Sequence, residues 1–217
     1  MTVRVAGILL AAGEGSRLGR PKALVELGGR TLAERGVTLL LGGGADPVLV
    51  VTGAAPLSMA TAHTVYNPDW RTGMGSSLAV GLRALELAGD EAAGGAAEAG
   101  SAGQPPVGAA VVALADQPLV GAEAVRRLIA AYRDGASVAV AAYDGKPRNP
   151  VLLAREHWAS VRELATGDTG ARPFLRAHPE LVTPVECGDT GRPDDVDTVS
   201  DLERLAGLIQ PGEQASR

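Results

Sequence analysis

The chain alternates between short, continuous apolar runs and longer stretches in which apolar residues recur with helical spacing. Continuous apolar runs of this length are typical of strands that are covered on both faces of a sheet. We predict strands at 3–10, 47–52, 64–66, 107–115, 137–142, 150–153 and 181–186. Helical spacing and helix start signals predict helices at 31–41, 75–88, 123–133, 156–164, 170–177 and 199–208. Strands that alternate with helices indicate an α/β fold with a mostly parallel sheet.

The length of 217 residues allows one large domain or two small ones. We predict a single domain over residues 1–210, because no internal repeat divides the chain. The low-complexity stretch at 89–108 is typical of a surface loop between a helix and a strand. Residues 211–217 are expected to form a frayed tail.

Composition and charge exclude several classes of partner. Aromatic residues make up only 3% of the chain and the net charge is -5, which argues against a nucleic-acid partner. No apolar segment approaches the roughly 20 residues that cross a bilayer, so we expect no membrane partner. Cys187 is the single cysteine and cannot form an internal disulfide. This fits a reducing compartment, and we expect a cytoplasmic location.

The most specific motif is LAAGEGSRLGRPK at 10–22, directly after the first predicted strand. Its glycines allow backbone N–H groups to surround phosphate oxygens. Arg17 adds a planar set of donors and Lys22 adds a compact positive charge. Taken alone, a Gly-x-Gly turn is an ordinary feature of protein surfaces, but the complete string predicts a phosphate-binding loop.

Two better-known phosphate motifs do not match this loop. The Walker A motif needs Gly-Lys-Ser/Thr at the start of a helix, whereas Lys22 follows Pro21 and precedes Ala23. The dinucleotide motif needs a third glycine where this chain has Leu18. The loop therefore belongs to a different class of phosphate site.

Acidic residues follow the fourth predicted strand and precede the last predicted helix. Asp116 lies at the carboxyl end of an apolar strand, where ligands bind in open α/β sheets. Beside a triphosphate, such a carboxylate is suited to hold Mg²⁺. Asp194, Asp195 and Asp197 form a second group, which alone is typical of a helix N-terminus. Together with Asp116, this group is a candidate for a second metal ligand.

The segment NPDWRTGMGSSL at 67–78 ends in small residues at the start of a predicted helix. A helix N-terminus offers free N–H groups that suit polar parts of a ligand. The alternative is an ordinary capped helix, with Ser76 or Ser77 as the N-cap residue.

These motifs together resemble the MobA-like NTP transferases, and within them the molybdenum cofactor cytidylyltransferases. The resemblance rests on the LAAG loop, on DQP at 116–118 and on RNPVLL, GDTGAR and DVDT, and it runs from about residue 5 to about residue 205. It implies a three-layer α/β/α Rossmann-like fold, phosphate contacts from Arg17 and Lys22, and Mg²⁺ held by Asp116 and Asp197. It further implies nucleotide contacts from Leu10, Ala11, Ala12, Gly13, Gly15, Thr52, Asn67, Gly75, Ser76 and Ser77.

The chain departs from this family at the turn before Pro150, where Asn149 replaces a frequent glycine. The departure concerns the pocket for the second substrate, for which Asp168, Thr169 and Arg148 are weak candidates by resemblance.

The resemblance implies transfer of CMP from CTP to the phosphate of molybdopterin or molybdenum cofactor, with release of pyrophosphate and with a molybdoenzyme as a possible protein partner. Two alternatives within the fold are a guanylyltransferase and a sugar-phosphate or alcohol-phosphate nucleotidyltransferase. An alternative outside catalysis is a carrier of the molybdenum cofactor.

Overall fold

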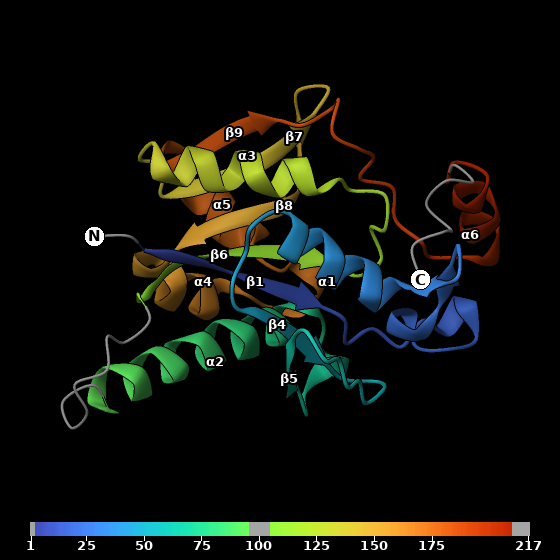
Figure 1. Ribbon diagram of the computed structural model, residues 1–217, viewed down its shortest axis with the longest axis horizontal. Helices are drawn as coiled ribbons and strands as arrows, with labels where there is room; N and C mark the ends of the chain where they lie inside the picture. Colours follow the sequence, from blue (N-terminus) through green and yellow to red (C-terminus); the bar gives the residue numbers. More distant parts are fainter. Residues whose placement is uncertain (1–2, 96–104, 210–217) are drawn as a thin grey trace.

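The computed structural model describes residues 3–95 and 105–209, which form a seven-stranded sheet flanked by helices (Figure 1). Within this sheet of described residues, β8 alone runs antiparallel to its neighbours, and the other adjacent pairs are parallel. The expectation of a mostly parallel sheet is therefore confirmed. In order across the sheet, the strands are β5 (His63–Tyr66), β4 (Val48–Thr52), β1 (Arg4–Leu10), β6 (Val107–Leu114), β8 (Lys146–Ala154), β7 (Val138–Tyr143) and β9 (Val182–Glu186).

The helices cover both faces of this sheet and confirm the three-layer arrangement. Side chains of β1 alternate between the faces, with Leu9 in the apolar cluster of α1 and α3, and Ile8 in the cluster of α2, α4 and α5. Both side chains are fully buried, because a central strand has a helical layer on each side. The helices are α1 (Leu32–Gly42), α2 (Met74–Gly95), α3 (Ala122–Arg133), α4 (Trp158–Leu164), α5 (Arg172–Ala177) and α6 (Val199–Ala206).

A capping box begins α1, as the spacing of Thr31 and Glu34 predicts. The Thr31 hydroxyl accepts a hydrogen bond from the Glu34 N–H at 3.2 Å, and the Glu34 carboxylate accepts one from the Thr31 N–H at 2.7 Å. Two N–H groups that have no partner inside the helix are satisfied in this way.

The helix predicted at 75–88 is longer than expected. α2 begins at Met74 and continues to Gly95, so the predicted loop at 89–108 is wrong for its first seven residues, 89–95. The sequence DEAA after Gly89 contains good helix formers, which outweigh the low helix propensity of the glycine. The rest of that loop up to residue 104, like the predicted tail at 211–217, lies outside the described residues. None of the described helices combines the length and the apolar character of a transmembrane span.

A small hairpin follows the glycine-rich loop and was not predicted from the sequence. β2 (Glu26–Leu27) and β3 (Arg30–Thr31) pair across a turn formed by Gly28 and Gly29, both at positive φ. Two consecutive residues at positive φ favour glycine, and this turn type joins short antiparallel strands. The hairpin packs against α6 in a third apolar cluster made of Val25, Leu27, Leu32, Val196 and Leu205.

Trp158 anchors α4 against the sheet and gives a test of this packing. Its side chain is fully buried, and its indole N–H donates a hydrogen bond to the Leu153 carbonyl at 3.0 Å. We expect Trp158→Phe to lower the free energy of unfolding by about 1–3 kcal/mol, because a buried hydrogen bond and buried ring atoms are lost. Urea unfolding followed by circular dichroism measures the change.

Tyr66→Phe serves as the control, because Tyr66 is 60% exposed on the edge strand β5. Exposed positions of this kind usually change stability by no more than about 0.5 kcal/mol. Equal unfolding midpoints for the Trp158 variant and the wild type would contradict the packing described for α4.

Candidate functional site

The glycine-rich loop leaves the carboxyl end of β1 and folds back on itself. Gly15 has a φ of 64°, and a Cβ atom at this position would lie 2.2 Å from the Arg20 carbonyl oxygen. The Lys22 N–H donates to the Gly13 carbonyl at 3.2 Å and closes the loop. Glycine at position 15 therefore allows the tight return that brings Lys22 close to the end of β1.

A cleft of about 700 Å³ opens at the carboxyl ends of β1 and β6. Ligands of open α/β sheets bind at this edge. The loop forms one wall and the start of α2 forms another, while Asp116 and Asp197 contribute carboxylates. The predicted site residues that line the cleft are Leu10, Ala11, Ala12, Gly13, Gly15, Arg17, Lys22, Ser77, Asp116 and Asp197.

Lys22 joins the two predicted metal ligands within this cleft. Its ammonium group lies 2.8 Å from Asp116 Oδ2 and 2.5 Å from Asp197 Oδ1. The three residues come from the beginning, the middle and the end of the chain. The structure thus brings together the cation and the carboxylates that the sequence placed far apart.

Backbone contacts hold the two acidic segments next to each other. The Ala115 N–H donates to the Leu10 carbonyl at 3.1 Å, which fixes the end of β6 beside the start of the loop. The Val196 N–H donates to the Asp116 carbonyl at 2.8 Å. The Val196 side chain is fully buried. It therefore anchors the backbone between Asp195 and Asp197, which flank it in the sequence.

The two aspartates beside Val196 have different roles. Asp197 lines the cleft and pairs with Lys22, whereas Asp195 accepts a hydrogen bond from the Gln117 side chain at 2.9 Å. Burial raises the pKa of Asp195, the hydrogen bond from Gln117 opposes this change, and the charges of Asp116 and Asp197 add to it. The choice of Asp197 rather than Asp195 agrees with this arrangement.

The charge of Lys22 is retained in spite of its partial burial. Burial alone lowers the pKa of Lys22, but the charges and hydrogen bonds of Asp116 and Asp197 outweigh it, and the pKa lies above its usual value. Asp116 keeps one unused acceptor, because its buried Oδ1 atom has no hydrogen-bond partner among the described residues. A buried oxygen of this kind is available to a cation.

Four predicted nucleotide contacts lie outside the cleft lining, namely Thr52, Asn67, Gly75 and Ser76. Asn67 is fully buried and donates to the hydroxyls of Ser76 and Ser77 at 2.9 and 3.0 Å. The Thr52 hydroxyl donates to the Val65 carbonyl at 3.3 Å. A Cβ atom on Gly75 would lie 2.7 Å from the carbonyl carbon of Ala165, so this glycine allows α2 to pack closely. Asn67 and Gly75 thus fix the start of α2, which forms one wall of the cleft.

The start of α2 differs from the sequence expectation of a serine cap. The helix begins at Met74, so Ser76 and Ser77 lie inside it. The Ser76 hydroxyl has the carbonyls of Asp69 and Gly73 as acceptors for its one proton, at 3.0 and 2.9 Å, and Ser77 accepts a hydrogen bond from Asn67. The hydroxyls thus hold the segment before the helix.

Trp70 and Arg71 also line the cleft, although neither is among the site residues predicted from the sequence. The Arg71 guanidinium carbon lies 4.3 Å from the centre of the Trp70 ring. Gly53 makes room for Trp70, because a Cβ atom there would lie 2.6 Å from the Trp70 Cβ. The scarcity of tryptophan, with two in the chain, was the available signal.

The three weak candidates for the second substrate do not line one common space. Asp168 lines the cleft and accepts a hydrogen bond from the Met74 N–H at 3.3 Å. Thr169 lines an adjoining cavity of about 40 Å³ that shares Leu10 and Met74 with the cleft. Arg148 is exposed and lines neither space.

Comparison with known proteins identifies the family of this chain. Residues 7–182 match the MobA-like NTP transferase domain. A protein of Paenarthrobacter nicotinovorans named nicotine blue oxidoreductase is 38% identical over 215 residues, which are 93% of this chain and 96% of that protein. A probable molybdenum cofactor guanylyltransferase of Opitutus terrae is 51% identical over 47 residues, which are 22% of this chain and 23% of that protein.

Solved structures show the same architecture. A homologue, from Mycobacterium sp. strain JC1, of the Mycobacterium tuberculosis protein Rv0371c aligns with a TM-score of 0.76 and 30% identity, over 96% of this chain and 98% of that chain. The domain match, the full-length similarity and the cleft at the end of β1 agree with one another, and the chain belongs to the MobA-like NTP transferase family of nucleotidyltransferases.

Proposed function

We propose that the protein transfers CMP from CTP to the phosphate of molybdopterin or molybdenum cofactor and releases pyrophosphate. The observation that carries the proposal is the pairing of Lys22 with Asp116 and Asp197 beside a glycine-rich loop. A fixed cation, paired carboxylates and a glycine-rich loop are the groups that nucleotidyl transfer needs.

In this reaction, an oxygen of the acceptor phosphate attacks the α-phosphorus of the nucleotide. The bond between the α-phosphorus and the bridging oxygen breaks, and pyrophosphate leaves with the electron pair. The acceptor phosphate is already anionic at neutral pH and needs no general base. Arg17 and Lys22 bind phosphate oxygens and offset the charge on the leaving group, and the loop aligns the reacting atoms.

The donor set of the site fits Mg²⁺, with Asp116 and Asp197 as the residues that would hold it. The unused Oδ1 atom of Asp116 supports this assignment, and Asp197 has a half-exposed side chain that faces the cleft. Mg²⁺ usually takes one or two carboxylates together with phosphate oxygens and water. When bound, the ion supplies positive charge to the phosphates.

The choice of CTP and of a molybdopterin-type acceptor rests on the LAAG and DQP strings and on the family. The name of the Opitutus relative supports a link to the molybdenum cofactor, although that protein is called a guanylyltransferase. GTP, or a sugar or alcohol phosphate as acceptor, would use the same cleft. A molybdoenzyme that receives the product completes the proposed set of partners.

Oxidoreduction is a second candidate function, because the Paenarthrobacter relative, which is 38% identical over 96% of its length, is named an oxidoreductase. An enzyme of that kind would need an electron donor bound in the cleft. The pairing of Lys22 with Asp116 and Asp197 (the Lys22 cluster) favours nucleotidyl transfer. Electron transfer does not require two carboxylates paired with a cation beside a glycine-rich loop.

Substitution of the cluster tests the assigned roles. We expect Lys22→Met and Asp116→Asn to keep the fold but to lose about 2–4 kcal/mol of transition-state stabilisation. This corresponds to a loss of roughly 30-fold or more in kcat/KM, measured by pyrophosphate release with CTP, Mg²⁺ and molybdenum cofactor. Lys146→Met and Asp134→Asn are matched controls at exposed positions and should retain wild-type turnover. Full activity of either cluster variant would exclude the role given to that residue.

A panel of nucleotides tests the substrate choice and the class of reaction. Pyrophosphate release is measured with CTP, GTP, ATP and UTP, each with and without molybdenum cofactor, and oxidation of NADH is followed in parallel with a quinone dye as acceptor. We expect release with CTP that depends on the cofactor. Pyrophosphate release with GTP but not with CTP would replace the cytidylyltransferase assignment by a guanylyltransferase. Binding of molybdenum cofactor without pyrophosphate release would indicate a carrier. NADH oxidation without pyrophosphate release would favour oxidoreduction.

A further inference from the structure

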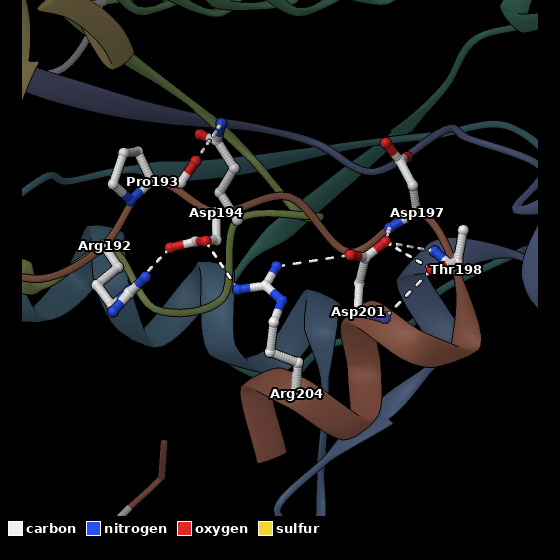
Figure 2. A network of polar contacts seen from close by, with 8 residues as sticks. Arg192, Pro193, Asp194, Asp197, Thr198, Asp201 and Arg204 are labelled. Carbon is white, nitrogen blue, oxygen red and sulfur yellow. Dashed lines mark hydrogen bonds and ion pairs between the residues drawn. The ribbon is translucent and has the colours of Figure 1, made fainter. Parts of the chain in front are cut away.

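The backbone that carries Asp197 is held by the first turn of α6. The Asp201 carboxylate accepts hydrogen bonds from the Thr198 N–H at 2.9 Å, from the Thr198 hydroxyl at 2.8 Å and from the Asp197 N–H at 3.3 Å. The Asp201 N–H in turn donates to the Thr198 hydroxyl at 3.2 Å. In Figure 2, the Asp197 carboxylate points away from this network, and it faces the cleft, where its Oδ1 atom pairs with Lys22.

Arg204 connects this capping box to the residues on the other side of Asp197. Its guanidinium lies 3.5 Å from Asp201 Oδ1 and 2.9 Å from Asp194 Oδ1, and Arg192 binds the second oxygen of Asp194 at 2.9 Å (Figure 2). Side-chain contacts thus hold the backbone both before and after the segment that contributes Asp197.

An apolar contact links α6 to the segment that follows Lys22. Leu205 of α6 is fully buried with Val196, Val25 and Leu27 in the third apolar cluster. Val25 lies three residues after Lys22, and Val196 lies directly before Asp197. α6 therefore contacts both sides of the Lys22–Asp197 ion pair, and Figure 1 shows it beside the amino-terminal segment that contains the loop.

We propose that α6 sets the position of Asp197 for cation binding, with Asp201 as the positioning residue and Arg204 as its support. The inference rests on the proposed function, in which Asp116 and Asp197 hold a divalent cation. α6 lies beyond residues 7–182, which match the family domain, so that match assigns no role to these residues. Residues that orient a metal ligand typically change metal affinity about 10- to 100-fold when they are replaced.

The test is a titration of the full chain with Mn²⁺ alone, in which free Mn²⁺ is measured by electron paramagnetic resonance. We expect Asp201→Ala to weaken Mn²⁺ binding by about tenfold or more, because the Asp197 backbone loses its anchor. Asp201→Glu should restore most of the affinity, since a glutamate at the same helix position forms the capping box of α1. Arg204→Met, which leaves the capping box intact, should have a smaller effect of about two- to fivefold.

Glu34→Ala is the matched control, because it removes the same kind of capping box from α1, where Glu34 does not line the cleft. Urea unfolding should show that Asp201→Ala and Glu34→Ala lose similar stability. The control should nevertheless keep Mn²⁺ affinity within about twofold of the wild type, as expected for a distant site. A positioning role is distinguished in this way from a general loss of stability.

The outcomes separate this inference from the proposed function. If the wild type binds Mn²⁺ and Asp116→Asn weakens binding, but Asp201→Ala behaves like Glu34→Ala, then the positioning role of α6 is overturned and the metal site stands. If the wild type does not bind Mn²⁺, or Asp116→Asn leaves binding unchanged, the metal assignment fails and this inference fails with it.

Discussion

The ion pairs of Lys22 are the constraint on which the arrangement of the site depends. One ammonium group lies between carboxylates from the end of β6 and from the segment before α6. Without this cation, Asp116, Asp195 and Asp197 would place three acidic groups close together around Val196, and like charges at short range repel. The glycine-rich loop, which ends at Lys22, therefore supplies the positive charge that lets the acidic segments converge.

Much of the sheet could be predicted from the sequence, because strands such as β4, β6 and β7 are buried on both faces and form continuous apolar runs. The β2–β3 hairpin was missed because each strand has only two residues and leaves no periodicity, although Gly28 and Gly29 were a turn signal. The extension of α2 was missed because alanine-rich sequence without an apolar stripe was interpreted as a loop. In these places, local propensity or turn chemistry decided the structure.

The charged residues of the candidate site could be identified from the sequence, whereas residues whose contacts depend on tertiary packing could not. Asp116 follows an apolar strand, Lys22 ends the glycine-rich string and Asp197 precedes α6, and the structure brings the three together. The family resemblance implies that Asn67 contacts the nucleotide, whereas its side chain donates hydrogen bonds to Ser76 and Ser77. A sequence does not show which polar group is already satisfied inside the fold, because that depends on neighbours fixed only by tertiary structure.

The order of the site residues along the chain has a consequence for the integrity of the protein. The glycine-rich loop follows directly after β1, whereas Asp197 and α6 come after the whole sheet in chain order. A proteolytic fragment that ends after β9 would retain every strand of the sheet and the apolar clusters on both its faces, yet Lys22 would have lost one of its two carboxylates. The amount of folded sheet in a sample is therefore a poor measure of intact sites, and only the presence of the carboxyl-terminal helix reports them.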